Sequence, residues 1–121
     1  MKNELIKVVS AAPCLKIADV NFNKKGIIKL INEESDSGLI VFPELSVTGY
    51  TSADLFQSDL LLKESEKAIT EIAEATKDKG LTVVVGVPLR YANCIYNCAA
   101  ILSDGKVKAL IPKIYIQLFE L

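Results

Sequence analysis

Two short, almost wholly apolar runs, Leu39–Phe42 and Leu81–Val87, most constrain what this chain can fold into. Runs of this length without polar alternation are typical of strands covered on both faces. A segment with helical periodicity precedes each run, from about Asp19 to Glu34 and from about Asp59 to Lys79. Another mostly apolar, β-rich stretch, Leu5–Ala12, lies ahead of both. The order strand, helix, strand, helix, strand predicts an α/β fold with a largely parallel start.

The last third of the chain predicts antiparallel strands instead. Asp104-Gly105, a strong hairpin signal, separates the strand patterns of Ile95–Ser103 and Lys106–Ile111. Gly80 follows the second helical segment, where a left-handed residue commonly ends a helix. The predicted fold class is therefore α/β, with a mixed sheet that begins parallel and ends antiparallel.

Length, composition and charge restrict the class of protein. The 121 residues suffice for one domain, and 50% of them are apolar, enough for a buried core. No apolar run approaches the roughly 18–20 residues that cross a bilayer, and no signal segment precedes the first strand. We therefore expect a soluble cytoplasmic protein without a membrane partner. A net charge of −1 argues against nucleic acid as a partner. We expect Lys24, Lys25 and Lys29 to lie on the solvent-exposed side of a helix.

The cysteines and the missing histidine limit the chemistry. Cys14, Cys94 and Cys98 lie in apolar sequence without the second ligand pair of a metal site, so we expect buried structural thiols and no metal. The sequence has no histidine. Catalytic groups of the Ser-His-Asp or Cys-His type therefore cannot be assembled from these residues, and acid–base chemistry falls to carboxylates, lysines or tyrosines.

Two charged residues follow predicted strands. Glu44 comes two residues after the run Leu39–Phe42, and Lys113 follows the second strand of the hairpin. Ligands of open α/β sheets gather beyond the carboxyl ends of the strands, and partial desolvation there suits a carboxylate to act as a base. Each residue also has an ordinary interpretation, Glu44 as a loop or helix-capping acid and Lys113 as a solvated lysine.

Five segments in order resemble the nitrilase, or carbon–nitrogen hydrolase, superfamily. Phe42–Tyr50 is similar to its first signature, Val83–Arg90 to its third strand, Tyr96–Lys106 to its hairpin and Ile111–Lys113 to its second signature. The run Thr51–Phe56 is similar to the form found in glutamine-dependent NAD synthetases. The resemblance covers almost the whole chain.

The resemblance implies a fold and roles for three residues. The superfamily folds as a four-layer αββα sandwich, of which this chain would supply the first half, a mixed sheet with helices on one face. Its catalytic groups are a glutamate, a lysine and a cysteine. Carried over, Glu44 is the general base, Lys113 is the cation near the reacting carbonyl, and Tyr115 contacts the substrate. That substrate is expected to be glutamine or another small amide.

The resemblance also implies what these residues lack. The sequence departs from the family after Lys113, and the family nucleophile lies downstream of that lysine. We therefore expect residues 1–121 to be a partial glutaminase domain, itself inactive, without the synthetase domain and without a cofactor. ATP and deamido-NAD would belong to that missing domain. A sheet lacking its partner layer would leave an apolar face bare, so we expect a homodimer or higher oligomer.

Two alternatives remain open. The chain could instead come from a superfamily member that acts on a different small amide, such as an amidase or a carbamoyl hydrolase. It could also be a non-catalytic fragment that folds and associates with itself. The Thr51–Phe56 run favours the glutaminase of an NAD synthetase over the first alternative.

Overall fold

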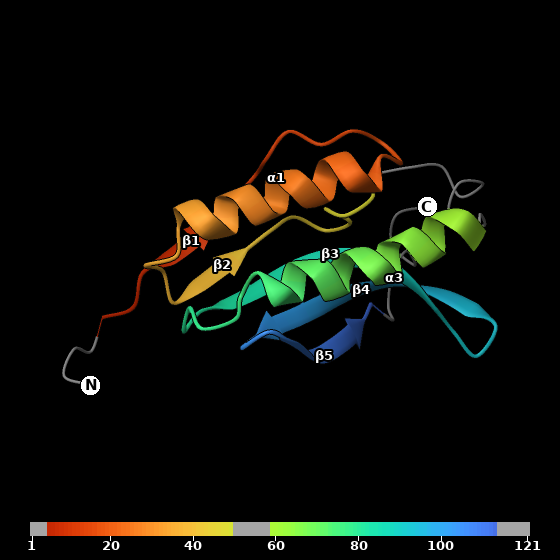
Figure 1. The fold of residues 1–121 in the computed structure, drawn as a ribbon. Helices are drawn as coiled ribbons and strands as arrows, with labels where there is room; N and C mark the ends of the chain where they lie inside the picture. Colours follow the sequence, from red (N-terminus) through yellow and green to blue (C-terminus); the bar gives the residue numbers. More distant parts are fainter. Residues whose placement is uncertain (1–4, 50–58, 114–121) are drawn as a thin grey trace, which may run out of the picture.

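The computed structural model describes residues 5–49 and 59–113. Within them the chain forms one five-stranded sheet and two helices (Figure 1). The elements in chain order are β1 (Val8–Ser10), α1 (Val20–Glu33), β2 (Leu39–Val41), α3 (Asp59–Glu74), β3 (Thr82–Tyr91), β4 (Cys94–Ser103) and β5 (Lys106–Pro112). This α/β arrangement confirms the predicted fold class.

The sheet is mixed, with the strands in sequence order from β1 to β5. β1, β2 and β3 are parallel, with Val9, Ile40 and Val83 in register across them. β3, β4 and β5 are antiparallel neighbours. The parallel start and antiparallel finish both agree with the sequence prediction.

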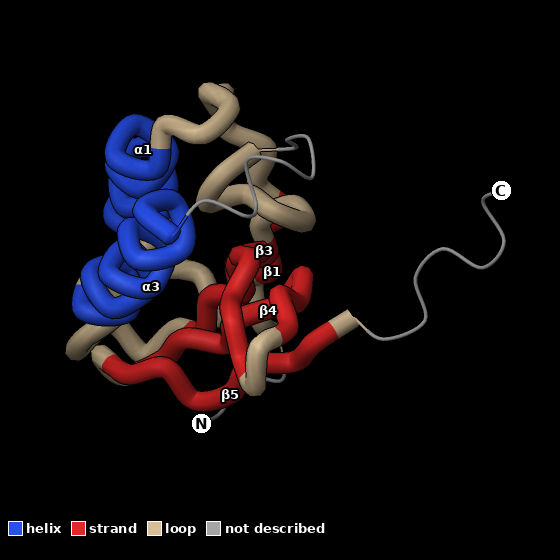
Figure 2. Tube along the Cα trace, turned by 90° about the vertical axis from the view of Figure 1, so that its right-hand side faces the viewer, coloured by secondary structure: helices blue, strands red, loops and turns tan. Residues whose placement is uncertain are grey.

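Both described helices pack on the same face of the sheet (Figure 2). Their apolar stripes supply one side of the core, and the inward-facing residues of β2, β3 and β4 supply the other. The fully buried members include Ile27 and Ile31 of α1, Ile72 of α3, and Val83 and Val85 of β3. The helical periodicity therefore identified the inner faces correctly.

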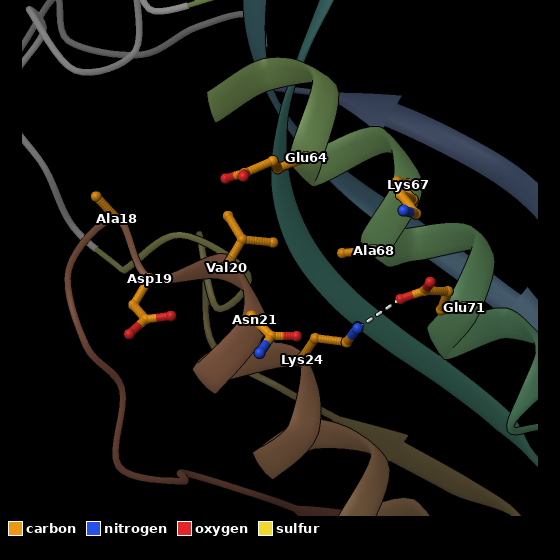
Figure 3. A pocket seen from close by; sticks show the side chains of 9 residues that line it. All are labelled: Ala18, Asp19, Val20, Asn21, Lys24, Glu64, Lys67, Ala68 and Glu71. Atoms are coloured by element: carbon orange, nitrogen blue, oxygen red, sulfur yellow. Dashed lines mark hydrogen bonds and ion pairs between the residues drawn. The ribbon is translucent and has the colours of Figure 1, made fainter. Parts of the chain in front are cut away.

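One lysine predicted to face water instead links the two helices. Lys24 of α1 donates to Glu71 of α3 at 2.6 Å across a hollow between them, and its side chain is only 20% exposed (Figure 3). The Lys24 ammonium holds the pKa of Glu71 below its ordinary value. The sequence pattern missed this ion pair because it shows a helix face but not the neighbouring helix.

β3 is longer than predicted, because it continues past Val87 to Tyr91 and turns directly into β4. The turn residues Ala92 and Asn93 are both left-handed, with φ of 52° and 66°. Pro88 has no N–H to donate to a neighbouring strand. It is tolerated within β3 because β2 pairs only with Thr82–Val84, so no β2 residue needs a hydrogen bond from position 88.

Other element ends differ by a few residues from the prediction. β1 is three residues long, shorter than the predicted Leu5–Ala12. α3 ends at Glu74, and turns carry the chain to Gly80, which has the expected left-handed φ of 65°. Across residues 5–49 and 59–113, neither helix is long and apolar enough to cross a membrane.

The face of the sheet opposite the helices is apolar, and no described helix lies on it (Figure 2). We call it the open sheet face. Its members alternate along the strands with the buried residues and are partly or largely exposed: Val8, Leu39, Val41, Val84, Ala99, Ile101 and Ile111. The exposed fractions reach 59% for Val8 and 54% for Ile111.

Candidate active site

Glu44 lies at the start of a compact loop that follows β2. The loop curls back at once, since Ser46 N–H donates to Pro43 O at 3.2 Å and Gly49 N–H to Leu45 O at 2.7 Å. Leu45 is left-handed, with φ of 56°. Leu45 and Val47 are buried, with 5% and 0% of their surface exposed, and Val47 belongs to the hydrophobic core. The loop is thus an anchored part of the fold.

Neighbouring elements hold this loop from two sides. On β3, Gly86 O accepts from Val47 N–H at 3.0 Å, and Gly86 N–H donates to Ser46 Oγ at 3.1 Å. On α1, the fully buried Asn23 donates from Nδ2 to Val47 O at 2.9 Å. The position of Glu44 is therefore set by β3 and α1 together.

Glu44 and Lys113 meet at the rim of the open sheet face. Lys113 Nζ lies 3.1 Å from Glu44 Oε2, and the two side chains are 44% and 38% exposed. The two residues, separated by 69 positions in the sequence, thus come within salt-bridge reach of each other. An ion pair this exposed contributes little to the stability of the fold. We therefore consider the two residues as candidate catalytic groups.

Asn97 of β4 is a third polar residue at this place, and sequence reasoning missed it. Its Nδ2 donates to Glu44 Oε2, and its backbone O accepts from Lys113 N–H at 2.9 Å. The sequence does hold one signal for it: Asn97 is an amide residue within the otherwise apolar run Ile95–Leu102. Because side chains alternate between the two faces of a strand, such a residue can lie on the uncovered face.

A shallow hollow of about 360 Å³ surrounds these three residues. Its wall comes from the ends of β2 and β5 and the middle of β3 and β4. The remaining lining residues are Phe42, Pro43, Val84, Val85, Gly86, Cys98, Ala99, Ile111 and Pro112. A mostly apolar hollow with a few converging polar groups is the usual form of a small-molecule site.

The cysteines differ from the prediction of three buried thiols. Cys98 is buried, and burial raises the pKa of its thiol. Its Sγ lies on the helix-covered side of β4, where it contacts Tyr96 O at 3.7 Å. Cys14 and Cys94 are exposed, so the prediction was wrong for them; apolar neighbours in sequence did not mean burial, because both lie outside the sheet's covered centre.

The two remaining points concern Tyr115 and metal binding. Tyr115 lies outside the described residues, so its contact with substrate stays a prediction. Among the residues that the structure describes, no three His, Cys, Asp or Glu side chains come together as a metal site would require.

Comparisons with known proteins cover almost the whole chain. Residues 7–116 match the family model described as carbon-nitrogen hydrolase. A glutamine-dependent NAD(+) synthetase of Mycobacterium leprae is 34% identical over 117 residues, which are 95% of this chain but 17% of the relative. The chain thus spans less than a fifth of that relative's length.

Solved structures show the same fold. The glutamine-dependent NAD+ synthetase of Acinetobacter baumannii, in complex with ADP, superposes with a TM-score of 0.82 at 32% identity, over 94% of this chain and 22% of that one. An amidase from Nesterenkonia sp. superposes with a TM-score of 0.73 at 17% identity, over 90% of this chain and 43% of that one. The family match extends over nearly all of this sequence and includes Glu44, Asn97 and Lys113; the chain belongs to the carbon-nitrogen hydrolase family.

Proposed function

We propose that this chain is part of the glutamine-hydrolysing domain of a glutamine-dependent NAD synthetase, and that its parent protein releases ammonia from glutamine for NAD synthesis. The observation that most directly supports this proposal is the Glu44–Lys113 ion pair, 3.1 Å long, in the apolar hollow. The substrate assignment draws on relatives: identity is 34% to the Mycobacterium leprae synthetase but 17% to the Nesterenkonia amidase. Glutamine is therefore favoured over another small amide.

The residue types suit the opening of a carboxamide. That reaction needs a nucleophile, a base that takes the nucleophile's proton, and positive charge where the carbonyl oxygen becomes an oxyanion. In this proposal Glu44 is the base and Lys113 carries the positive charge. Tyr115, two residues after Lys113, contacts the glutamine. ATP and deamido-NAD would be bound by the synthetase domain, outside these residues, and this segment would hold no cofactor.

The proposal also includes a cytoplasmic location for the parent protein and self-association of this polypeptide. A cytoplasmic site fits three unpaired cysteines, because thiols stay reduced there. The open sheet face is a surface that we expect to pair with a second copy of this polypeptide.

The 121-residue polypeptide by itself should not hydrolyse glutamine. Neither Cys14 nor Cys94 lines the hollow, and the Cys98 thiol lies on the other side of β4, so no thiolate is available to attack the amide. Ammonia release from glutamine should equal that of a Glu44→Gln variant. Steady release above background that Glu44→Gln abolishes would contradict the proposed division of roles.

A transplant tests the function itself. Residues 1–113 would replace the matching segment of the Mycobacterium leprae synthetase, with NAD formation measured from glutamine and, separately, from ammonia. We expect both activities in the chimera. Glu44→Gln and Lys113→Met should each reduce the glutamine-dependent rate by about 10²–10⁴-fold, as loss of acid–base or oxyanion groups does. The ammonia-dependent rate should not change.

Matched variants separate these roles from general charge effects. Glu33→Gln and Lys108→Met make the same changes at exposed positions on α1 and β5, and both activities should persist. A chimera that makes NAD from ammonia but releases none from glutamine, while hydrolysing small aliphatic amides, would favour the amidase alternative.

A further inference from the structure

One carboxylate oxygen of Glu44 receives two donors. Asn97 Nδ2 donates to Glu44 Oε2, and Lys113 Nζ donates to the same oxygen at 3.1 Å. Asn97 also contacts Lys113 directly, because its backbone O accepts from Lys113 N–H at 2.9 Å. A single residue of β4 thus bonds to the carboxylate through its side chain and to the lysine through its main chain.

The placement of Asn97 makes it the better fixed of the two donors. It lies within β4, opposite Pro88 of β3, and the bond from Lys113 continues the β4–β5 ladder past Pro112. An asparagine side chain has two rotatable bonds, whereas the lysine ammonium ends a flexible four-carbon stem. Strand geometry therefore aims the amide, while the ammonium can move within the hollow.

We propose that Asn97 is a positioning residue, which fixes the Glu44 carboxylate and the Lys113 backbone relative to each other. This inference rests on the proposed function, in which Glu44 is the base. An amide N–H can only donate, so it favours the ionised carboxylate that a base requires. Being neutral, it does so without adding a second positive charge to that of Lys113.

The arrangement predicts how two substitutions of similar size differ. Asn97→Leu keeps the backbone bond to Lys113 but removes the donor to Glu44, which should raise the pKa of Glu44. Asn97→Asp places a second carboxylate against Glu44, which should raise that pKa further, because like charges resist joint ionisation. A residue that donates no bond to the Glu44 carboxylate would not produce the increase in Asn97→Leu.

The experiment is a carboxyl-carbon NMR titration of the 121-residue polypeptide, with Glu44→Gln to assign the Glu44 signal. In the unsubstituted chain, the side-chain amide signals of Asn97 should shift with the midpoint of Glu44. Glu44 should titrate at higher pH in Asn97→Leu and at still higher pH in Asn97→Asp. Asn21→Asp, the same change at an exposed position on α1, should leave the Glu44 titration unaltered.

The outcomes are decisive even if a variant does not fold, since the first measurement needs no substitution. If the chemical shifts of the Asn97 side-chain amide do not change as Glu44 titrates, the inference is wrong. It is also wrong if Glu44 has the same titration midpoint in folded Asn97→Leu and in the unsubstituted chain. The titration measures no turnover, so failure of the proposed function would appear in the chimera assays and leave this result unaffected.

Discussion

Replacing Gly86 with alanine should destabilise the chain by about 2–4 kcal/mol, the sum of an overpacking cost of about 1–3 and weakened hydrogen bonds of about 1. A Cβ at this position would lie 2.7 Å from Glu44 C and 2.8 Å from Pro43 O, and would contact Leu45 N even more closely. All three are backbone atoms, so the neighbour cannot give way by rotating a side chain. The loop that carries Glu44 would have to move off β3.

Moving that loop breaks the contacts that hold it. Gly86 makes two hydrogen bonds to the loop, one to Ser46 Oγ and one from Val47 N–H. Leu45 and Val47, now buried, would lose part of their packing. Glu44 should leave the reach of Lys113 as a result, so the substitution is expected to disturb the candidate site as well as the fold.

Urea unfolding and amide hydrogen exchange measure the two effects. The free energy of unfolding should fall in Gly86→Ala, and the Val47 amide, which donates to Gly86 O, should lose protection from exchange. Gly26→Ala is the matched control, because a Cβ there meets nothing within 4 Å inside α1. It should stabilise the chain by about 0.5–1 kcal/mol. A Gly86→Ala variant as stable as the original would mean that the loop does not lie against β3.

Much of the fold was predictable because it follows from local patterns. The apolar stripes of both helices and the Asp104-Gly105 turn depend on residues near one another in sequence, and all appear as predicted. The turn at Ala92-Asn93 was not predicted, because alanine rarely adopts a left-handed conformation and gives no turn signal. There the pairing of two ten-residue strands decides the conformation.

The candidate site shows a similar division. Strand ends placed Glu44 and Lys113 at a common rim, and the family resemblance supplied their roles. The part played by Asn97 depends on the β3–β4 register, since a shift of one residue would turn its side chain to the helix-covered face. The buried bond from Asn23 to Val47 depends on how α1 packs. Sequence patterns carry neither kind of information.

The 121-residue polypeptide should associate through the open sheet face and run as a dimer or larger species. Apolar side chains from all five strands contribute to this face, with Val41 37% exposed and Ile111 54% exposed. Within the described residues no second layer covers it. Apolar patches of several hundred Å² are uncommon on soluble monomers, so this surface favours a partner.

A second copy is the partner that fits this surface. Packed about a two-fold axis, two such faces cover each other with the same residues from each chain. At about 25 cal/mol per Å², the burial is worth on the order of 10 kcal/mol before the cost of association. Because association costs about 4–15 kcal/mol, at best about 6 kcal/mol remains, so we expect a reversible dimer with a Kd of tens of micromolar or weaker.

Light scattering at about 1 mM polypeptide should give a mass that approaches or exceeds twice the 13.2 kDa of one chain, and the mass should fall on dilution. Ile101→Lys places a charge on β4 at the centre of the face, where burial without a partner costs about 3–5 kcal/mol. Association should weaken at least a hundredfold. Leu60→Lys, at a 66% exposed position on α3 in the helical layer, is the control and should leave the mass unchanged.

The two variants together distinguish this face from other routes of association. If Leu60→Lys dissociates the species and Ile101→Lys does not, the helical layer forms the contact. A monodisperse monomer of about 13 kDa at about 1 mM polypeptide would contradict pairing through the open sheet face altogether. Because Ile101 is only partly buried in the single chain, a lysine there can reach water once the copies separate. Loss of the dimer would therefore report on the interface, and circular dichroism would confirm that the fold persists.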